Sequence, residues 1–178
     1  MNKTQKTTLF IITTVFLALL FFKNYISPAD LLYNGTIETT DIEFPVDVYF
    51  DEYGVPSIFA ETDEDMFFVA GYVGARDRLF QMSFMKYAYK GQLSRVLNDT
   101  LFVEDKFLRT LGFETIAEKS LNKMPPEIIK NLQSTCDGIN AYIQTLSPKD
   151  YPLEFKLIGI DKLPTFEPKD IAGLSTMM

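Results

Sequence analysis

The sequence contains no histidine, no tryptophan and only one cysteine among its 178 residues. Without histidine, the chain cannot build a Ser-His-Asp or Cys-His catalytic arrangement, or any metal site that uses an imidazole. A lone cysteine cannot form a disulfide within the chain, so cysteine usage does not indicate a redox compartment. Basic residues are also few, with 17 Lys and Arg against 24 Asp and Glu, for a net charge of -7. This acidic balance argues against a nucleic-acid partner, which requires a basic face.

Apolar residues are plentiful, at 47% of the chain, and the length suits one domain with a buried core. The longest apolar run, TTLFIITTVFLALLFF at residues 7–22, follows Lys3 and Lys6. Its roughly 16 residues lie between the core of a signal peptide and the roughly 20 residues of a membrane span. Because no small-residue cleavage pattern precedes Pro28, residues 1–23 are predicted to be an uncleaved signal anchor. The protein would then be membrane-anchored and extracytoplasmic, in the periplasm or at the cell surface. A cleaved signal peptide, which would give a secreted protein, is the alternative.

A polar spacer is predicted over residues 24–43, and a strand pattern follows it. Residues 44–62, FPVDVYFDEYGVPSIFAET, alternate apolar and polar side chains on both sides of a turn signal. This pattern predicts a β-hairpin, with Pro56 at an edge or a bulge. The next acidic stretch, TDED, is typical of a helix start, so a long helix is expected from Asp63 to Lys90, ending at Gly91.

Residues 44–178 are predicted to form the folded segment of the chain, and three more helices are predicted in it. One covers about residues 103–123. Another begins at MPPE, with proline in its first turn, and carries an apolar stripe of Ile129, Leu132, Cys136, Ile139 and Ile143. The last begins at Pro168, after an irregular connection. The predicted fold class is therefore α+β and mainly helical, with an N-terminal β-hairpin.

Few residue patterns suggest chemistry. Cys136 lies on an apolar stripe with no histidine to activate it, so a buried structural cysteine is favoured over a nucleophile. A cluster of carboxylates could act as a pair or bind metal, but carboxylates near helix starts usually complement the helix dipole. Its members are Asp63, Glu64 and Asp65, with Glu104 and Asp105. The glycosylation pattern N-x-[ST] occurs at Asn2, Asn34 and Asn98, but it is frequent by chance.

The stretch GYVGARDRLFQM, residues 71–82, lies inside the long predicted helix. Glycine there costs roughly 1 kcal/mol relative to alanine, and unpaired charges cost more. Gly71 and Gly74 would give the helix a surface without bulk on which another element can approach closely. Asp77 and Arg78 would be buried there and paired with groups of that element. The stretch therefore predicts a packing helix rather than a catalytic loop.

Several motifs, in the same order, resemble the start of the penicillin acylase (penicillin amidase) family. They are VYFDEYGVPSIFAETDEDMFFVAGYVGARDRLFQM, GQLSRVL, FLRTLGF, CDGINAYI, PLEFKLIG and FEPKDIAG. The resemblance covers about residues 49–173 and concerns the leading, or alpha, chain of that family. Where many members have GYVHAQDR, this chain has GYVGARDR, with Gly74 in place of histidine.

The resemblance implies an N-terminal-nucleophile hydrolase with an αββα fold, of which this segment is an incomplete part. Such an enzyme cleaves its own precursor, and the serine that begins the trailing, or beta, chain becomes the nucleophile. The free amino group of that serine, with a pKa near 8, acts as the base and replaces histidine. A backbone amide and an asparagine would form the oxyanion hole. No serine of this chain is followed by asparagine, so these positions should lie on the trailing chain.

For this segment, the resemblance implies no catalytic, cofactor-binding or metal-binding residue, with calcium possible in the full-length fold. The segment would supply a scaffold and part of an acyl-pocket wall, and it would be inactive alone. Its partners would be the trailing chain and a small N-acyl amide substrate of β-lactam or acyl-amine type. The glycines and charges of GYVGARDR would then form a docking surface for the missing remainder. The alternative is a noncatalytic, membrane-anchored helical interaction protein from a truncated or split gene.

Overall fold

The computed structural model describes residues 3–26 and 34–177. The chain divides into two compact units, Met1–Asp30 and Leu31–Met178. In the first unit, α1 spans Lys3–Ile26. No helix among the described residues combines the length and the apolar character needed to cross a membrane. The predicted membrane anchor is therefore not supported, because an apolar run of roughly 16 residues that includes two threonine pairs is shorter than a bilayer requires.

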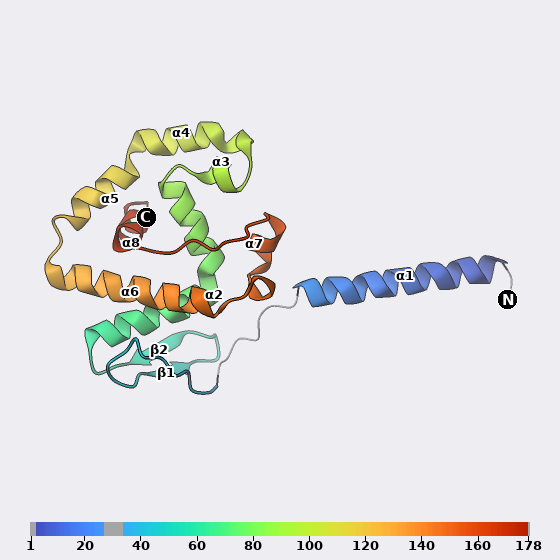
Figure 1. Ribbon diagram of the computed structural model, residues 1–178, viewed down its shortest axis with the longest axis horizontal. Helices are drawn as coiled ribbons and strands as arrows, with labels where there is room; N and C mark the ends of the chain where they lie inside the picture. The colour runs from blue at the N-terminus through green and yellow to red at the C-terminus, as the bar shows by residue number, and fades with distance from the viewer. Residues whose placement is uncertain (1–2, 27–33, 178) are drawn as a thin grey trace. The chain divides into compact units, whose positions relative to one another are not determined.

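The second unit opens with a β-hairpin and continues as helices (Figure 1). Strand β1 (Asp47–Phe50) pairs antiparallel with β2 (Pro56–Phe59). The elements that follow are α2 (Asp63–Tyr89), α3 (Leu93–Val96), η1 (Asp99–Leu101), α4 (Phe102–Leu111), α5 (Phe113–Leu121), α6 (Pro126–Thr145), η2 (Pro148–Asp150), α7 (Leu153–Leu157) and α8 (Pro168–Thr176). This arrangement confirms the predicted α+β, mainly helical class with its N-terminal hairpin, and Pro56 begins the second strand as expected.

Helix α2 begins and ends close to where local signals predict. The Thr62 hydroxyl accepts a hydrogen bond from the backbone N–H of Asp65 at 3.1 Å and so caps the first turn. Gly91 follows the last turn with φ +58°, a conformation that glycine adopts without strain. Inside the helix, Arg78 leaves helical geometry, with φ -138° and ψ 24°. The resulting kink was not predicted.

The single helix expected over residues 103–123 is wrong. Gly112 adopts φ +74° between α4 and α5 and breaks the helical path there. Two short helices, α3 and α7, also lie in stretches where no helix was expected. Helix α6 does begin at the predicted proline, and α8 begins at Pro168 as predicted.

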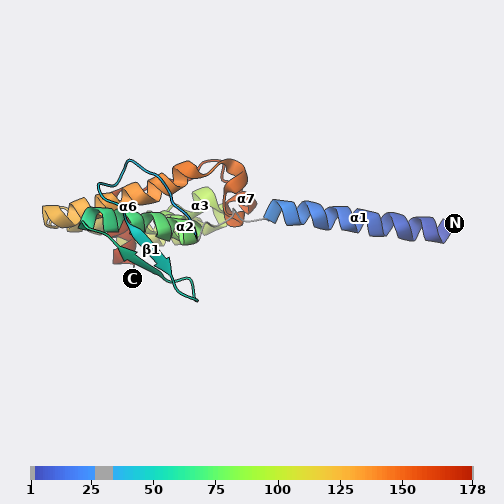
Figure 2. The same cartoon turned by 90° about the horizontal axis from the view of Figure 1, so that it is seen from below.

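The core of the second unit lies where α2 packs against α6, with the connection after α6 covering it (Figure 1). Its buried side chains are Ala75, Leu79, Cys136, Ile139, Tyr142, Phe155, Leu163 and Phe166. In Figure 2, α2 and α6 lie in one shallow layer, and the hairpin projects from it. Helix α8 packs against α5 and also contacts α2 and α6.

Helices α2 and α6 cross at two glycines. A Cβ atom on Gly71 would lie 2.1 Å from the backbone oxygen of Thr135. A Cβ atom on Gly138 would lie 1.9 Å from the backbone oxygen of Phe68. Both positions therefore require glycine, because no side chain fits at such a separation. The close approach predicted at Gly71 is real, but its partner is a helix of the same chain and not a missing remainder.

Candidate functional site

The charged end of GYVGARDR lies at the kink of α2 and largely faces solvent. Asp77 and Arg78 are both exposed. Asp77 accepts a hydrogen bond from Arg76 Nε at 2.8 Å, and Arg78 Nη1 donates to Gln81 Oε1 at 3.1 Å. Within the described part of the chain neither side chain is buried, because the buried side of α2 is taken by Ala75 and Leu79. The pairing of Asp77 and Arg78 with a missing remainder stays a prediction.

Gly74 differs from Gly71 in its surroundings. No atom lies within 4 Å of the position that a Gly74 Cβ would occupy. Gly74 therefore packs closely against no other element of the described chain, and its role in docking a missing remainder stays a prediction. Only one of the two glycines in the motif explains a helix crossing within the chain.

Arg76 is the charge in this stretch that sequence reasoning missed. Its side chain is only 9% exposed, and its guanidinium carbon lies 4.6 Å from the centroid of the Phe50 ring. A cation over an aromatic face is attracted by the ring quadrupole, so this contact ties α2 to β1. Helical spacing was the available signal, because Arg76 falls three and four residues after the inward-facing Val73 and Tyr72.

A cavity of about 410 Å³ opens beside Arg76. It lies between β1, α2 and the segment that precedes β1. Its lining is mainly apolar and aromatic, with the arginine at its wall, and includes Ile37, Ile42, Phe50, Phe68, Tyr72 and Arg76. Cavities of this size and lining are able to receive an apolar group.

A buried charge network joins α8 to the last turns of α2. Asp170 is fully buried and accepts hydrogen bonds from Lys86 Nζ at 2.7 Å and from the Tyr89 hydroxyl at 2.5 Å. Lys90 Nζ lies 2.7 Å from Oδ1, the oxygen that accepts from Tyr89, and the backbone N–H of Glu167 donates at 2.9 Å to Oδ2, the oxygen that accepts from Lys86. Burial alone would raise the pKa of Asp170, but the hydrogen bonds from Lys86, Lys90 and Tyr89 outweigh it and lower the pKa. Because both carboxylate oxygens are occupied by donors, this cluster holds α8 in place.

The other parts of the FEPKDIAG stretch also fix α8. The Asn140 side-chain amide donates to the Phe166 carbonyl at 2.9 Å and accepts from the Phe166 N–H at 2.8 Å. A Cβ atom on Gly173 would lie 2.6 Å from the Tyr89 ring, so that position has no room for a side chain. The motif therefore has a packing role in this part of the chain.

The thiol considered as a nucleophile is inert in this structure. Cys136 is fully buried in the core between α2 and α6. Burial raises the pKa of its thiol to about 12, so the thiolate is not formed near neutral pH. The structure thus places Cys136 as the buried structural cysteine that was favoured.

The acidic residues considered as a site lie apart and serve separate helix ends. Asp65 accepts hydrogen bonds from the N–H groups of Glu43 at 2.9 Å and Phe44 at 3.1 Å, and it ties the segment before β1 to α2. Asp105 accepts from the N–H groups of Leu93 at 2.7 Å and Ser94 at 2.8 Å. Burial would raise the pKa of both carboxyls, but these hydrogen bonds outweigh it and lower both values.

The remaining members of that acidic cluster lie elsewhere. Glu64 pairs with Lys130 of α6, while Asp63 and Glu104 are exposed. Among the described residues, no group of three or more His, Cys, Asp or Glu side chains could hold a metal ion. Of the three glycosylation patterns, Asn2 lies outside the described residues, Asn34 is exposed, and Asn98 caps η1 by accepting from Thr100 N–H at 2.9 Å.

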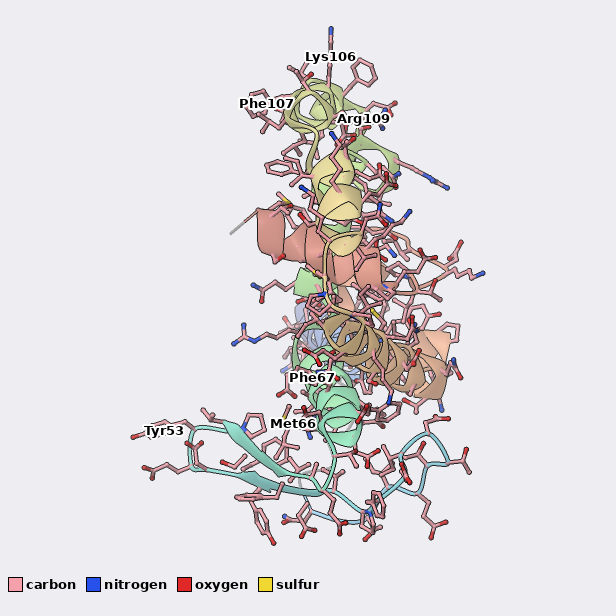
Figure 3. All side chains as sticks on the ribbon, turned by 90° about the vertical axis from the view of Figure 1, so that its left-hand side faces the viewer. Tyr53, Met66, Phe67, Lys106, Phe107 and Arg109 are labelled. Carbon is pink, nitrogen blue, oxygen red and sulfur yellow. The ribbon has the colours of Figure 1, made fainter. Side chains whose placement is uncertain are left out.

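Two apolar faces of the second unit remain exposed. The hairpin face comprises Tyr49, Tyr53, Val55 and Phe59, and the α4 face comprises Phe102, Val103, Phe107 and Leu111. Figure 3 shows Tyr53 at one end of this unit and Phe107 at the other. Exposed apolar surface of this kind marks interaction sites in soluble domains. These two faces are therefore candidate interaction surfaces.

Comparison with known proteins agrees with this arrangement. The family model for penicillin amidase matches residues 45–178. The chain belongs to the penicillin amidase family. It is 32% identical to penicillin G acylase of Escherichia coli over 125 residues, which are 68% of this chain and 15% of that protein. It is 29% identical to penicillin acylase 2 proenzyme of Pseudomonas sp. (strain SE83) over 131 residues, which are 74% of this chain and 17% of that protein.

A third relative is named as another kind of acylase. The acyl-homoserine lactone acylase QuiP of Pseudomonas aeruginosa is 31% identical over 90 residues, 51% of this chain and 11% of that protein. Among solved structures, a thermostable penicillin G acylase from Alcaligenes faecalis superposes with a TM-score of 0.68 at 24% identity, covering 74% of this chain and 70% of that chain. The fold is thus that of the leading part of a penicillin G acylase. The chain spans between 11% and 17% of the length of these three relatives.

Proposed function

We propose that this chain is the leading part of an amidase precursor of the penicillin amidase family. The complete enzyme would hydrolyse the amide bond of small N-acylated substrates, of β-lactam or acyl-amine type. The observation that carries the proposal is the continuous family match over residues 45–178. The match covers the leading part alone, so the nucleophile would come from a trailing chain.

The lengths of the matched proteins support an enzyme of two chains. The aligned region covers 70% of the chain in the solved acylase but only 17% of the proenzyme relative. A short leading chain that is separate in the solved acylase accounts for this difference. The word proenzyme in the name of that relative also fits a precursor that is later cleaved.

The chemistry of the described residues fits a supporting role. The Cys136 thiol is buried, and the carboxylates of Asp65, Asp105 and Asp170 accept hydrogen bonds that hold helices and the chain before β1. Calcium in the complete enzyme would therefore be bound by residues outside this set. The leading chain would supply a scaffold and part of the wall of the acyl pocket, and alone it would be inactive.

An exported location is part of this proposal. Lys3 and Lys6 precede an apolar helix, which is typical of a signal peptide. A reporter enzyme that works only after export should be active when it is fused after the chain, and one that works only in the cytoplasm should not. A reporter that is active only in the cytoplasm would contradict this part.

Reconstitution tests the proposed activity. The purified chain should not hydrolyse a chromogenic phenylacetyl amide or a long-chain acyl amide. Coexpression with the trailing part of the Escherichia coli relative should give a complex that does. The trailing part expressed alone is the control. Turnover by the leading chain alone, or the absence of any complex, would contradict the proposal.

A noncatalytic interaction protein is the second candidate, and the two exposed apolar faces favour it as well. In that case the chain would be a monodisperse, self-sufficient domain. Its thermal unfolding and its gel-filtration volume would not change with the trailing part present. A complex with hydrolytic activity excludes this candidate.

A further inference from the structure

We infer that Asp170 is a positioning residue for the proposed amidase reaction. It would act through α8, by fixing where this helix and the part of the enzyme that follows it lie relative to α2. The inference rests on the proposed function, because it concerns how the leading part of the enzyme holds what comes after it. Asp170 would therefore matter for turnover as well as for stability.

Helix α8 has little means of fixing its own position. It comprises nine residues, Pro168–Thr176, and isolated helices shorter than about 12 residues are marginal in water. None of its buried residues carries a large apolar side chain; they are Asp170, Ala172 and Gly173. The larger Ile171 and Leu174 are only half-buried. Because apolar contacts are non-directional, polar contacts set the rotation of α8 about its axis.

Donors from α2 approach both oxygens of the buried carboxylate. Lys86 Nζ lies 2.7 Å from Oδ2 of Asp170, while Lys90 Nζ lies 2.7 Å from Oδ1. The Tyr89 hydroxyl also donates to Oδ1, and the backbone N–H of Glu167 donates to Oδ2 at 2.9 Å. Hydrogen bonds are directional, so this set fixes both the rotation of α8 and its height along α2.

A gain in stability does not explain why this position is ionic. Burial of an ion pair carries a large desolvation cost, and its replacement by well-packed apolar side chains is often neutral or stabilising. Buried polar groups can instead specify one arrangement out of several that have similar stability. The Asp170 carboxylate meets its donors in one register, whereas an apolar side chain would tolerate small shifts. The ionic cluster is therefore suited to fixing the position of α8.

Gly173 gives a second, independent constraint on α8. It lies one turn after Asp170, and a Cβ atom there would lie 2.6 Å from the Tyr89 ring. The same tyrosine thus limits the distance between α8 and α2 with its ring and orients Asp170 with its hydroxyl. Asn140 of α6 also pairs with both backbone groups of Phe166, two residues before α8 begins. Contacts from α2 and α6 therefore hold α8 at several points.

In the complete enzyme, α8 would lead into the remainder. The family match runs to residue 178, just after α8, and the relatives are much longer than the matched region. Figures 2 and 3 show the C-terminal end of α8 on the same side of α2 as the tip of the hairpin, where Tyr53 lies. A misplacement of about 1 Å by a mutation far from the chemistry can lower a rate by about 100-fold. A shift of α8 would be carried into the residues that follow it and from there to the bound substrate.

The test uses a precursor in which the full chain is followed by the part of the Escherichia coli relative that lies beyond the matched region. Two variants move α8 in different ways. Asp170→Glu keeps the negative charge but lengthens the side chain by one methylene group, and Gly173→Ala leaves every charge in place but adds a Cβ against the Tyr89 ring. Ser175→Ala is the matched control in the same helix, because Ser175 is exposed and its hydroxyl donates to the Ala172 carbonyl of α8 itself at 2.8 Å.

Kinetics per active site separates positioning from folding. Active sites would be counted by titration with a sulfonyl fluoride, which reacts with the nucleophilic serine, and the substrate is the chromogenic phenylacetyl amide. Asp170→Glu and Gly173→Ala should each lower kcat/KM per active site at least about tenfold, while Ser175→Ala should stay within about twofold of the wild type. A residue that only stabilises the fold would lower the number of active sites and leave kcat/KM per site unchanged.

An unchanged kcat/KM per active site in either Asp170→Glu or Gly173→Ala, or an equal loss in Ser175→Ala, would overturn the inference and leave the proposed function standing. If one of the two variants forms no active sites, Tyr89→Phe replaces it, since this change removes one hydrogen bond to Asp170 and keeps both lysines. Its kcat/KM per site should fall at least about threefold, and an unchanged value would again overturn the inference. If the wild-type precursor gives no amidase activity, the proposed function fails and the inference fails with it.

Discussion

Replacement of Gly71 by alanine should separate α2 from α6 and destabilise the chain. The added Cβ would lie 2.1 Å from the backbone oxygen of Thr135 and 3.0 Å from its carbonyl carbon. These are backbone atoms of α6, so they cannot move unless the helix moves. An ordinary contact requires the two helices to shift apart by about 1 Å at their crossing, and this loosens the core around Ala75 and Cys136.

The expected magnitude combines two opposing effects. Overpacking of a well-packed site typically costs about 1 to 3 kcal/mol, and a clash with backbone belongs at the upper end of that range. Alanine recovers part of this cost, since it favours a helix by up to about 1 kcal/mol relative to glycine. The net loss for Gly71→Ala should be about 2 kcal/mol, which corresponds to a fall in Tm of about 4 to 8 °C in a chain of this size.

Gly74→Ala is the matched control in the same helix. No atom lies within 4 Å of the Gly74 Cβ position, so only the helix preference acts, and the free energy of unfolding should rise by about 0.5 to 1 kcal/mol. Urea unfolding followed by circular dichroism measures both variants against the wild type. If Gly71→Ala unfolds at the wild-type urea midpoint, or if both variants lose the same stability, the tight crossing of α2 and α6 is refuted.

Three further predictions follow from the buried polar groups. Asp170→Asn should lower the free energy of unfolding in urea by about 3 to 5 kcal/mol, because it leaves two lysine ammonium groups without their carboxylate. The control Asp137→Asn, at an exposed position, should stay within about 0.5 kcal/mol of the wild type. Equal effects of the two variants would contradict the role of Asp170. The pKa values of Asp65 and Asp105 lie below their ordinary 3.8, so their stabilising contribution is complete above about pH 5 and is lost as the pH falls through the lower folded values. A urea midpoint that does not change between pH 6 and pH 2 would contradict this. Cys136 should resist a thiol reagent at pH 8 in the folded chain and react fully in urea, since burial raises its pKa to about 12; rapid labelling of the folded chain would show that the core is open.

Local signals explain the parts of the fold that the sequence predicted well. The Thr62 cap, the glycine after α2 and the proline at the start of α6 act through the backbone within a few residues, so they can be recognised in one short stretch. The break at Gly112 was missed because helical patterns lie on both sides of it. The kink at Arg78 has no proline or other local signal that would predict it.

The contacts that define the candidate site could not be predicted in this way. Asp170 and Tyr89 are bonded across 81 residues of sequence, and the acidic residue alone was indistinguishable from an ordinary first-turn carboxylate. The sequence indicated that Gly71 allows close approach, but not that Thr135 of α6 is the partner. The family, in contrast, was recognisable because several short motifs occur in a fixed order along the chain.

The most direct test of the account is the N-terminal sequence of whatever copurifies with this chain from its own cells. The chain would be isolated with an antibody raised against residues 44–178 and separated from its partners under denaturing conditions. We predict a larger second chain that begins with serine, as required if the leading chain completes an N-terminal-nucleophile amidase. Isolation of this chain alone, or with a partner that does not begin with a nucleophilic residue, would contradict the central claim.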